Sequence, residues 1–358
     1  YFFLIFFSIK YKEKIRCDLS VDDLDNFNTE LRFKELEKYL KTICIHHGIK
    51  KKRKGYFIFE NYKNTSEEIL FIKHFSIFYN LSLSTLFYSL RTSNNLFLFL
   101  LKIMKIVSKY ETIFNQIKSD FLIQERHYNT SALKNFIFKK YGGKYCCVTQ
   151  KNIFQINGPG MYVNSDIFFS LGKKTGEEVK KYAGNVKKII PIGSLAMELN
   201  YFKRKEKNNL PTYDLIVFAS DHNKIFHSGY DNYYHDYLAH YKWIKKLAEE
   251  HKNILIGIKL KKIITDKNVI NIFKDLKNVN FLFDRKYASD SYFYAAKAKA
   301  LCTWSSTLAF EFLGHGRVVY FCDPNNKNIS FLPNKKFIKM FKLNNYKSFK
   351  KKILGQIK

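Results

Sequence analysis

The second half of the chain alternates short apolar runs with helical patterns, and this alternation is the feature that most restricts its fold. The apolar runs cover residues 214–219, 253–258, 279–283 and 300–303. The helical patterns that separate them cover residues 234–251, 269–276 and 289–297. Short runs that are apolar on both faces are typical of strands buried in a parallel sheet. Four strand–helix units within about 110 residues predict a doubly wound, Rossmann-like α/β domain.

The first half shows the same order less regularly. We expect strands at residues 121–123, 144–149 and 166–170, with helices at 131–141 and 175–184. Residues 67–120 read as mostly helical, with a break near 91–95. Leu96–Val107 is apolar, but Lys102 and Lys105 interrupt it, so a packed helix is favoured over a membrane span. The sequence therefore predicts a helix-rich N-terminal α/β domain.

The length of 358 residues fits two domains, at about 150 residues per domain. A polar linker at 203–209 is followed by Pro211, and it divides the chain into domains 1–205 and 206–358. Residues 1–9 are apolar but shorter than the roughly 20 residues of a spanning helix, so we expect a buried strand. Because the chain begins at Tyr1 and ends in mid-pattern at Lys358, we expect a truncated N-terminal domain or a missing last helix.

The formal net charge of +31 suggests an anionic partner. The basic residues are mostly lysines spread through the whole chain, beside abundant Asn, Ile, Phe and Tyr. Nucleic acid is therefore not the expected partner. A phosphate-bearing small substrate or the surface of an anionic membrane fits the same charge.

Several familiar sites are excluded by spacing. The six cysteines form no C-x-x-C pair, so we expect buried, reduced thiols and neither a zinc site nor a disulfide framework. The histidines of the second half, which lack H-x-x-x-H spacing, are expected in loops and on the surface: His222, His227, His235 and His240. No G-x-G-x-x-G follows a strand, and no P-loop or G-x-S-x-G motif is present. We expect no metal and no bound cofactor.

The turn after the fourth apolar run holds three hydroxyl residues, Ser305, Ser306 and Thr307, where a helix would begin. Such side chains cap free backbone N–H groups, and the same helix end attracts phosphate. Glu311 lies four residues after Thr307 and so on the same helix face. A clamp for a sugar nucleotide and an ordinary helix cap both fit this pattern.

Polar residues also follow the other strands of the second half. They are Ser220 and Asp221, Lys259 and Lys261, and Ser289 and Ser291. Ligands of parallel sheets sit at the carboxyl ends of the strands, so these turns would converge on a diphosphate.

The chain resembles the GT-B-fold glycosyltransferases of bacterial surface-polysaccharide and capsule biosynthesis, whose relatives include CDP-glycerol glycerophosphotransferases and Kdo transferases. The resemblance covers residues 120–325, and its main element is Ser305–Glu311 with Gly314–Val319. It implies two Rossmann-like domains facing a cleft, with the nucleotide-activated donor held by the C-terminal domain. Ser306 and Thr307 would then face the phosphates, and Glu311 would bind sugar or ribose hydroxyls.

Two departures from this family concern the general base. Of the family's Gln-His-Gly-like element only Gln150 remains, and no histidine stands among the lysines after Ile258. Glu125 and His127 are the remaining candidates, since activation of an acceptor hydroxyl needs a carboxylate or an imidazole.

The resulting expectation is a metal-independent glycosyltransferase that uses a nucleotide-activated sugar as substrate and a glycan or lipid-linked acceptor. It would act in the cytoplasm at the inner face of the membrane, in peripheral contact with anionic lipid. The alternatives are a sugar-nucleotide epimerase or polyol-phosphate transferase on the same fold, and a non-catalytic protein that binds polyanions or membranes.

Overall fold

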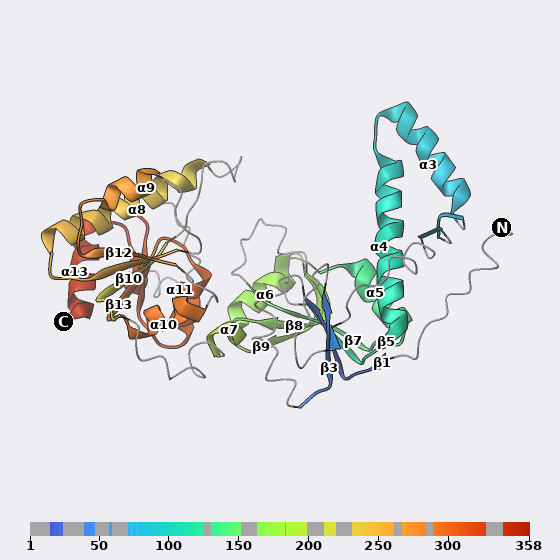
Figure 1. The fold of residues 1–358 in the computed structure, drawn as a ribbon, viewed down its shortest axis with the longest axis horizontal. Coiled ribbons are helices and arrows are strands. Elements are labelled where there is room, and N and C mark those ends of the chain that lie inside the picture. The colour runs from blue at the N-terminus through green and yellow to red at the C-terminus, as the bar shows by residue number, and fades with distance from the viewer. Residues whose placement is uncertain are drawn as a thin grey trace. The chain divides into compact units, whose positions relative to one another are not determined.

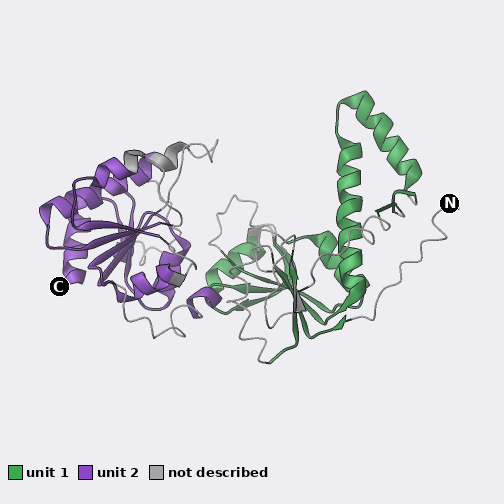
Figure 2. Cartoon of the chain, in the orientation of Figure 1, with its two compact units in different colours: residues 1–192 green, residues 193–358 purple. Residues whose placement is uncertain are grey.

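The computed structural model describes residues 15–23, 39–46, 57–58, 71–72, 74–76, 78–124, 130–151, 163–182, 184–198, 211–219, 231–260, 267–283, 289–326 and 339–358. The chain forms two compact units, residues 1–192 and residues 193–358 (Figure 2). Each unit is built around its own parallel sheet.

The sheet of the second unit has six parallel strands in the order β12-β11-β10-β13-β14-β15. The strands are β10 (Leu215–Phe218), β11 (Ile256–Lys259), β12 (Val279–Leu282), β13 (Ala300–Thr303), β14 (Val319–Cys322) and β15 (Lys342–Leu343). The helices are α7 (Leu195–Met197), α8 (Asp231–Glu250), α9 (Lys267–Phe273), α10 (Ser289–Lys297), α11 (Thr307–Gly314) and α13 (Tyr346–Ile357) (Figure 1). The strand order reverses between β10 and β13, which confirms the doubly wound, Rossmann-like prediction.

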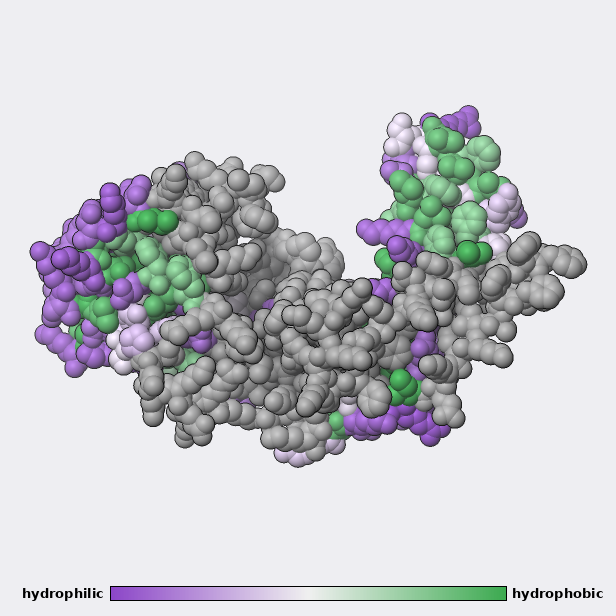
Figure 3. Space-filling view, viewed as in Figure 1, coloured by the Kyte–Doolittle hydropathy of each residue, from purple (hydrophilic) through white to green (hydrophobic). Residues whose placement is uncertain are grey.

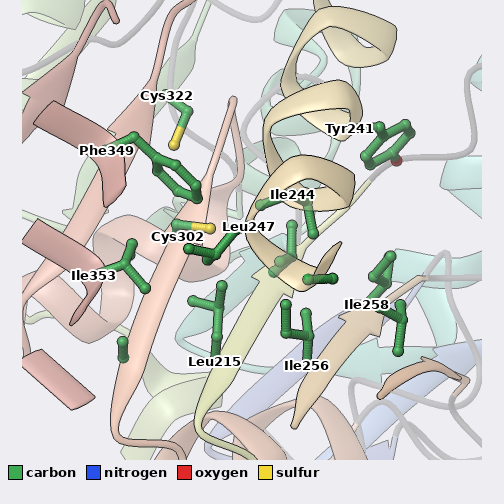
Figure 4. Close-up of a cluster of buried hydrophobic side chains, with 14 of the residues drawn as sticks. Leu215, Tyr241, Ile244, Leu247, Ile256, Ile258, Cys302, Cys322, Phe349 and Ile353 are labelled. Atoms are coloured by element: carbon green, nitrogen blue, oxygen red, sulfur yellow. The ribbon is translucent and has the colours of Figure 1, made fainter. Parts of the chain in front are cut away.

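Both faces of this sheet are covered, so its central strands are apolar throughout. Leu215 and Val217 of β10 enter one cluster, with Tyr241, Ile244, Leu247 and Phe349 from the helices on that side (Figure 4). Ile216 and Phe218 enter the cluster on the opposite face. A Cβ atom at Gly257 of β11 would lie 2.5 Å from Ile216 Cδ1, so this position between β10 and β12 fits only glycine without displacement of its neighbours.

The sheet of the first unit has seven parallel strands in the order β4-β3-β2-β6-β7-β8-β9. They are β2 (Leu19–Asp23), β3 (Thr42–His46), β4 (Phe57–Ile58), β6 (Phe121–Gln124), β7 (Tyr145–Thr149), β8 (Asn164–Ser170) and β9 (Asn185–Pro191). A separate pair joins β1 (Ile15–Arg16) and β5 (Ile117–Lys118), and the helices include α3 (Tyr79–Thr92), α4 (Leu96–Gln116), α5 (Ala132–Lys140) and α6 (Lys173–Tyr182). The order reverses between β2 and β6, so this unit is also Rossmann-like.

Helices α3 and α4 form a hairpin that projects from the first unit (Figure 1). The break predicted near residues 91–95 is confirmed, with Ser93 in the left-handed region at φ +57°. The packed helix predicted at 96–107 is found only in part, because the buried residues of α4 begin at Met104. In the part of the chain that the structure describes, no helix combines the length and the hydropathy needed to cross a membrane.

A buried ion pair joins the end of β2 to α5. The Lys134 ammonium donates to the Asp22 carboxylate, and the two side chains are 3% and 2% exposed. The lysine also lies over the Tyr110 ring of α4, 5.6 Å from its centroid. A buried charge that loses its partner is strongly destabilising, since neither water nor another ion replaces it.

We predict that Lys134→Met lowers the free energy of unfolding of the first unit by about 3 kcal/mol or more. The matched control is Lys144→Met, which removes the exposed Lys144–Asp120 pair at the surface and is expected to cost far less. Urea denaturation followed by circular dichroism measures both. Equal losses for the two variants would contradict the assigned role of the buried pair.

Candidate nucleotide site

Three neighbouring strands of the second unit end at the same level. Phe218 of β10 is paired with Lys259 of β11 on one side and with Thr303 of β13 on the other. The Thr303 hydroxyl also donates to the Phe218 carbonyl, at 2.8 Å. The carboxyl ends of these three strands form one edge of the sheet. This edge includes the point between β10 and β13 where the strand order reverses, which is where open parallel sheets bind their ligands.

The hydroxyl-rich turn lies directly beyond that edge, between β13 and α11. Ser305, Ser306 and Thr307 are all half-buried, and the helix begins at Thr307 as predicted. Ser306 occupies the N-cap position with an extended backbone, but its side chain makes no capping hydrogen bond. The expected serine cap is therefore absent at this described helix end. The backbone N–H groups of the first turn of α11 therefore donate no hydrogen bond to Ser306, and the helix dipole adds positive potential at this end of the helix.

The Glu311 carboxylate is held from two other helices. Its Oε1 accepts a hydrogen bond from the Ser194 hydroxyl at 2.7 Å, and its Oε2 accepts one from the Tyr292 hydroxyl at 2.8 Å. Ser194 is itself the N-cap of α7 and accepts from the backbone N–H of Met197 at 3.1 Å. Tyr292 belongs to α10. These contacts fix the carboxylate one helical turn inside α11, on the face of Thr307.

The remaining residues predicted for this site are distributed along the same edge. Lys259 is 4% exposed, and its ammonium donates to the Leu260 carbonyl at 2.6 Å. It stands two strand spacings, about 10 Å, from Thr303. Ser291 is buried on α10 next to Tyr292, and Ser289 begins that helix. The side chain of Ser289, and Ser220, Asp221 and Lys261, lie outside the described residues.

In the first unit, the corresponding edge is formed by the ends of β2 and β6. Gln124, the last residue of β6, donates to the Asn135 amide oxygen at 3.0 Å. The predicted bases Glu125 and His127 follow it directly and lie outside the described residues. Gln150, at the end of β7, accepts from the Leu171 backbone N–H at 2.8 Å and from the Thr175 hydroxyl at 3.1 Å. That glutamine therefore fastens the turn into α6.

One cluster of potential metal ligands lies among the described residues, and it is buried in the core of the second unit. The ligand atoms of His240, Cys302 and Cys322 all lie within 4.8 Å of one another, and each residue is 0% exposed. Burial raises the pKa of the Cys322 thiol well above its usual range, aided by the hydrogen bond with Cys302. The expectation that His240 lies at the surface is wrong, because helix α8 turns it onto the sheet. The five described cysteines are buried and reduced, as predicted.

Two contributors to the site, Ser194 and Tyr292, were not predicted as site residues. Ser194 is separated from Glu311 by 117 positions and Tyr292 by 19, and no local spacing signals either contact. Ser194 follows Gly193 at a strand-to-helix turn, where a serine cap is expected. Residues 192–194 and 289–292 also fit the family resemblance, which assigns neither Ser194 nor Tyr292 a role.

Solved structures similar to this chain show which fold it has. No family model matches the chain, and no curated protein matches its sequence. The Neisseria meningitidis UDP-GlcNAc 2-epimerase, solved with UDP-GlcNAc bound, superposes with a TM-score of 0.56 at 11% identity over 96% of this chain and 91% of that one. The chain has the GT-B fold.

Other structures similar to this GT-B chain come from two kinds of enzyme. A Listeria monocytogenes protein described as a UDP-N-acetylglucosamine 2-epimerase has a TM-score of 0.53 at 11% identity, over 96% of this chain and 88% of that one. The wall teichoic acid polymerase TagF has a TM-score of 0.48 at 12% identity, over 97% and 83%. The two structures with TM-scores above 0.5 show that the resemblance inferred from the β13–α11 turn holds at the level of the fold.

We predict that Tyr292→Phe and Ser194→Ala each destabilise the second unit by about 1.5 kcal/mol, because each removes a hydrogen bond to a carboxylate. The matched control is Tyr346→Phe, which removes a hydroxyl that donates to the exposed Glu250 at 2.7 Å and should cost much less. Urea denaturation of the variants measures the difference. A Tyr292→Phe variant as stable as the control would show that Glu311 is not held as described.

Proposed function

We propose that this GT-B chain is a glycosyltransferase that moves a sugar from a nucleotide-activated donor to a surface glycan or lipid-linked acceptor. The observation that carries the proposal is the Glu311 carboxylate, fixed by Ser194 and Tyr292 one turn inside a helix that begins at the reversal point of the sheet. The surrounding Ser-Ser-Thr-x-x-x-Glu sequence resembles that of surface-polysaccharide transferases.

The N-terminus of α11 and Glu311, one turn further along the helix, suit two different parts of a sugar nucleotide. The N–H groups at Thr307 and the positive end of the helix dipole suit the diphosphate, whose charge grows as the glycosidic bond to the leaving group breaks. The Glu311 carboxylate, held by Ser194 and Tyr292, is a hydrogen-bond acceptor that suits hydroxyl donors. A ribose or sugar hydroxyl donating to it would set the orientation of the donor.

Other predicted residues take supporting roles in this proposal. Lys259 at the end of β11 and Lys261 after it would supply positive charge, and Ser289 and Ser291 of α10 would supply hydroxyls. Glu125 or His127, which follow β6 at the reversal point of the first unit, would take the proton of the acceptor hydroxyl. The reaction in this form needs no metal and no cofactor beyond the donor substrate.

Epimerisation of a nucleotide sugar is the second candidate. It is favoured by the two structures with TM-scores above 0.5 described above, both UDP-N-acetylglucosamine 2-epimerases by description. Both reactions need the same nucleotide site in the second unit, and they differ in whether an acceptor is required.

We predict that one of UDP, CDP, GDP or CMP raises the melting temperature of the chain, and that Glu311→Gln or Thr307→Ala removes most of that rise. The matched control is Glu250→Gln, because Glu250 also accepts a tyrosine hydroxyl but lies at the far end of α8. Differential scanning fluorimetry at increasing nucleotide concentration measures the shift, which follows from binding to the folded state.

The outcomes separate the candidates. Release of free nucleotide from the matching sugar donor only when a glycan acceptor is added supports transfer. A change of the donor sugar without an acceptor supports epimerisation. Indifference to all four nucleotides, together with salt-sensitive binding to DNA or to polyanions, would contradict the nucleotide site.

A further inference from the structure

The α3–α4 hairpin exposes a dense group of large apolar side chains. The most exposed are Leu90 at 74%, Phe87 at 66% and Phe99 at 61%. The others on the hairpin are Phe78, Tyr79, Leu81, Tyr88, Leu96 and Leu98. In Figure 3 the viewed face of this projecting element is largely hydrophobic, with hydrophilic residues at its end and edges. Contiguous apolar surface of this kind marks a site that is covered by a partner or by lipid.

The apolar residues lie on more than one side of the hairpin and do not form a single stripe. Phe87 and Leu90 lie three positions apart and share one side of α3, whereas Leu81 and Tyr88 lie on the opposite side. Leu96, Leu98 and Phe99 continue the surface onto the first turn of α4. The turn that joins the two helices, residues 91–95, is polar and exposed, so the apolar surface lies on the sides of the hairpin and not at its end. A partner protein would cover one side of such a hairpin, whereas an apolar phase contacts more than one.

The charges on the hairpin have one sign. Between residues 78 and 110 there is no Asp or Glu, and the cations are Arg91, Lys102, Lys105 and Lys109. At about 1.5 Å per residue, Lys102 and Lys105 lie about 9 and 14 Å along α4 from Leu96. Interfacial helices lie along the membrane surface with their apolar face buried about 5–10 Å, and long cationic side chains on the same segment reach the lipid phosphates. Arg91 has a stem long enough to reach the same level.

The base of the hairpin is fixed to the first unit. Glu111, near the end of α4, accepts from His74 at 2.7 Å and from Lys140 of α5 at 2.9 Å. These contacts, with that of His74 first, lower the pKa of Glu111 to about 2. Ile113 and Phe114 are buried beside it. The outer half of the hairpin therefore projects from a fixed base.

We propose that the outer half of the α3–α4 hairpin inserts its apolar sides into the surface of an anionic lipid bilayer, with its polar turn, Lys102 and Lys105 at the headgroups. The occupant is lipid because the apolar surface lies on more than one side of the hairpin and because its charges are only positive. This inference concerns the first unit and does not depend on the nucleotide site. A Glu311→Gln variant should bind vesicles as the unaltered chain does.

The first experiment measures insertion by fluorescence. Phe87→Trp places a reporter on the outer half of the hairpin, and Phe136→Trp places one on α5, where Phe136 is 68% exposed away from the hairpin. Vesicles of phosphatidylcholine with about a third phosphatidylglycerol should shift the Phe87→Trp emission to shorter wavelength and leave the Phe136→Trp emission unchanged. Quenching by brominated lipid should affect only the Phe87→Trp reporter.

The second experiment separates the apolar and the charged contributions by vesicle co-sedimentation. A Phe87→Ser/Leu90→Ser/Phe99→Ser variant should lose binding to both neutral and anionic vesicles. Lys102→Gln/Lys105→Gln should weaken binding to anionic vesicles on the order of tenfold, and less so in high salt. The matched control, Lys351→Gln/Lys352→Gln on the exposed face of α13, should bind like the unaltered chain.

Two results would overturn the proposal. If Phe87→Trp emits at short wavelength before vesicles are added and does not respond to them, protein already covers the outer half of the hairpin. Concentration-dependent dimers in that case would assign the surface to a second copy. If substitution of either lysine pair weakens vesicle binding equally, the overall charge of the chain binds the lipid and the hairpin has no specific role.

Discussion

The paired carboxyl ends of β11, β10 and β13 determine where polar side chains can gather in the second unit. Because both faces of the sheet are buried, the residues along these strands are apolar, and polar groups are confined to the ends. The turn at Ser305–Thr307 and the first turn of α11 lie at that end. Glu311 is placed there by hydrogen bonds from α7 and α10, so the candidate site depends on how the helices pack as well as on the sheet.

The apolar runs predicted much of this arrangement. Runs such as Leu215–Phe218 and Ala300–Thr303 are buried on both faces, and that pattern has one main structural solution, a parallel strand. The contacts of Glu311 could not be predicted in the same way, because Ser194 is distant in sequence and its hydroxyl is only one of many. His240 was misjudged although the helix around it was predicted, because the spacing of the histidines does not show which face of α8 turns onto the sheet.

The two units present different kinds of surface. The second unit combines a helix N-terminus with a fixed carboxylate, a combination suited to a small polar ligand that carries phosphate. The first unit carries an exposed apolar hairpin whose charges are all positive, which suits an extended anionic surface. Apolar residues on α3 and α4 thus have a different physical meaning from those of the sheets, although their composition is similar. Only their exposure in the fold distinguishes them.

The five described cysteines can report on the stability of the two units separately. Cys17, Cys146 and Cys147 are buried in the first unit, and Cys302 and Cys322 in the second. A thiol reagent can reach them only when the unit that contains them opens. Their rates of modification, assigned by peptide mass, would therefore give the opening free energy of each unit separately within the intact chain.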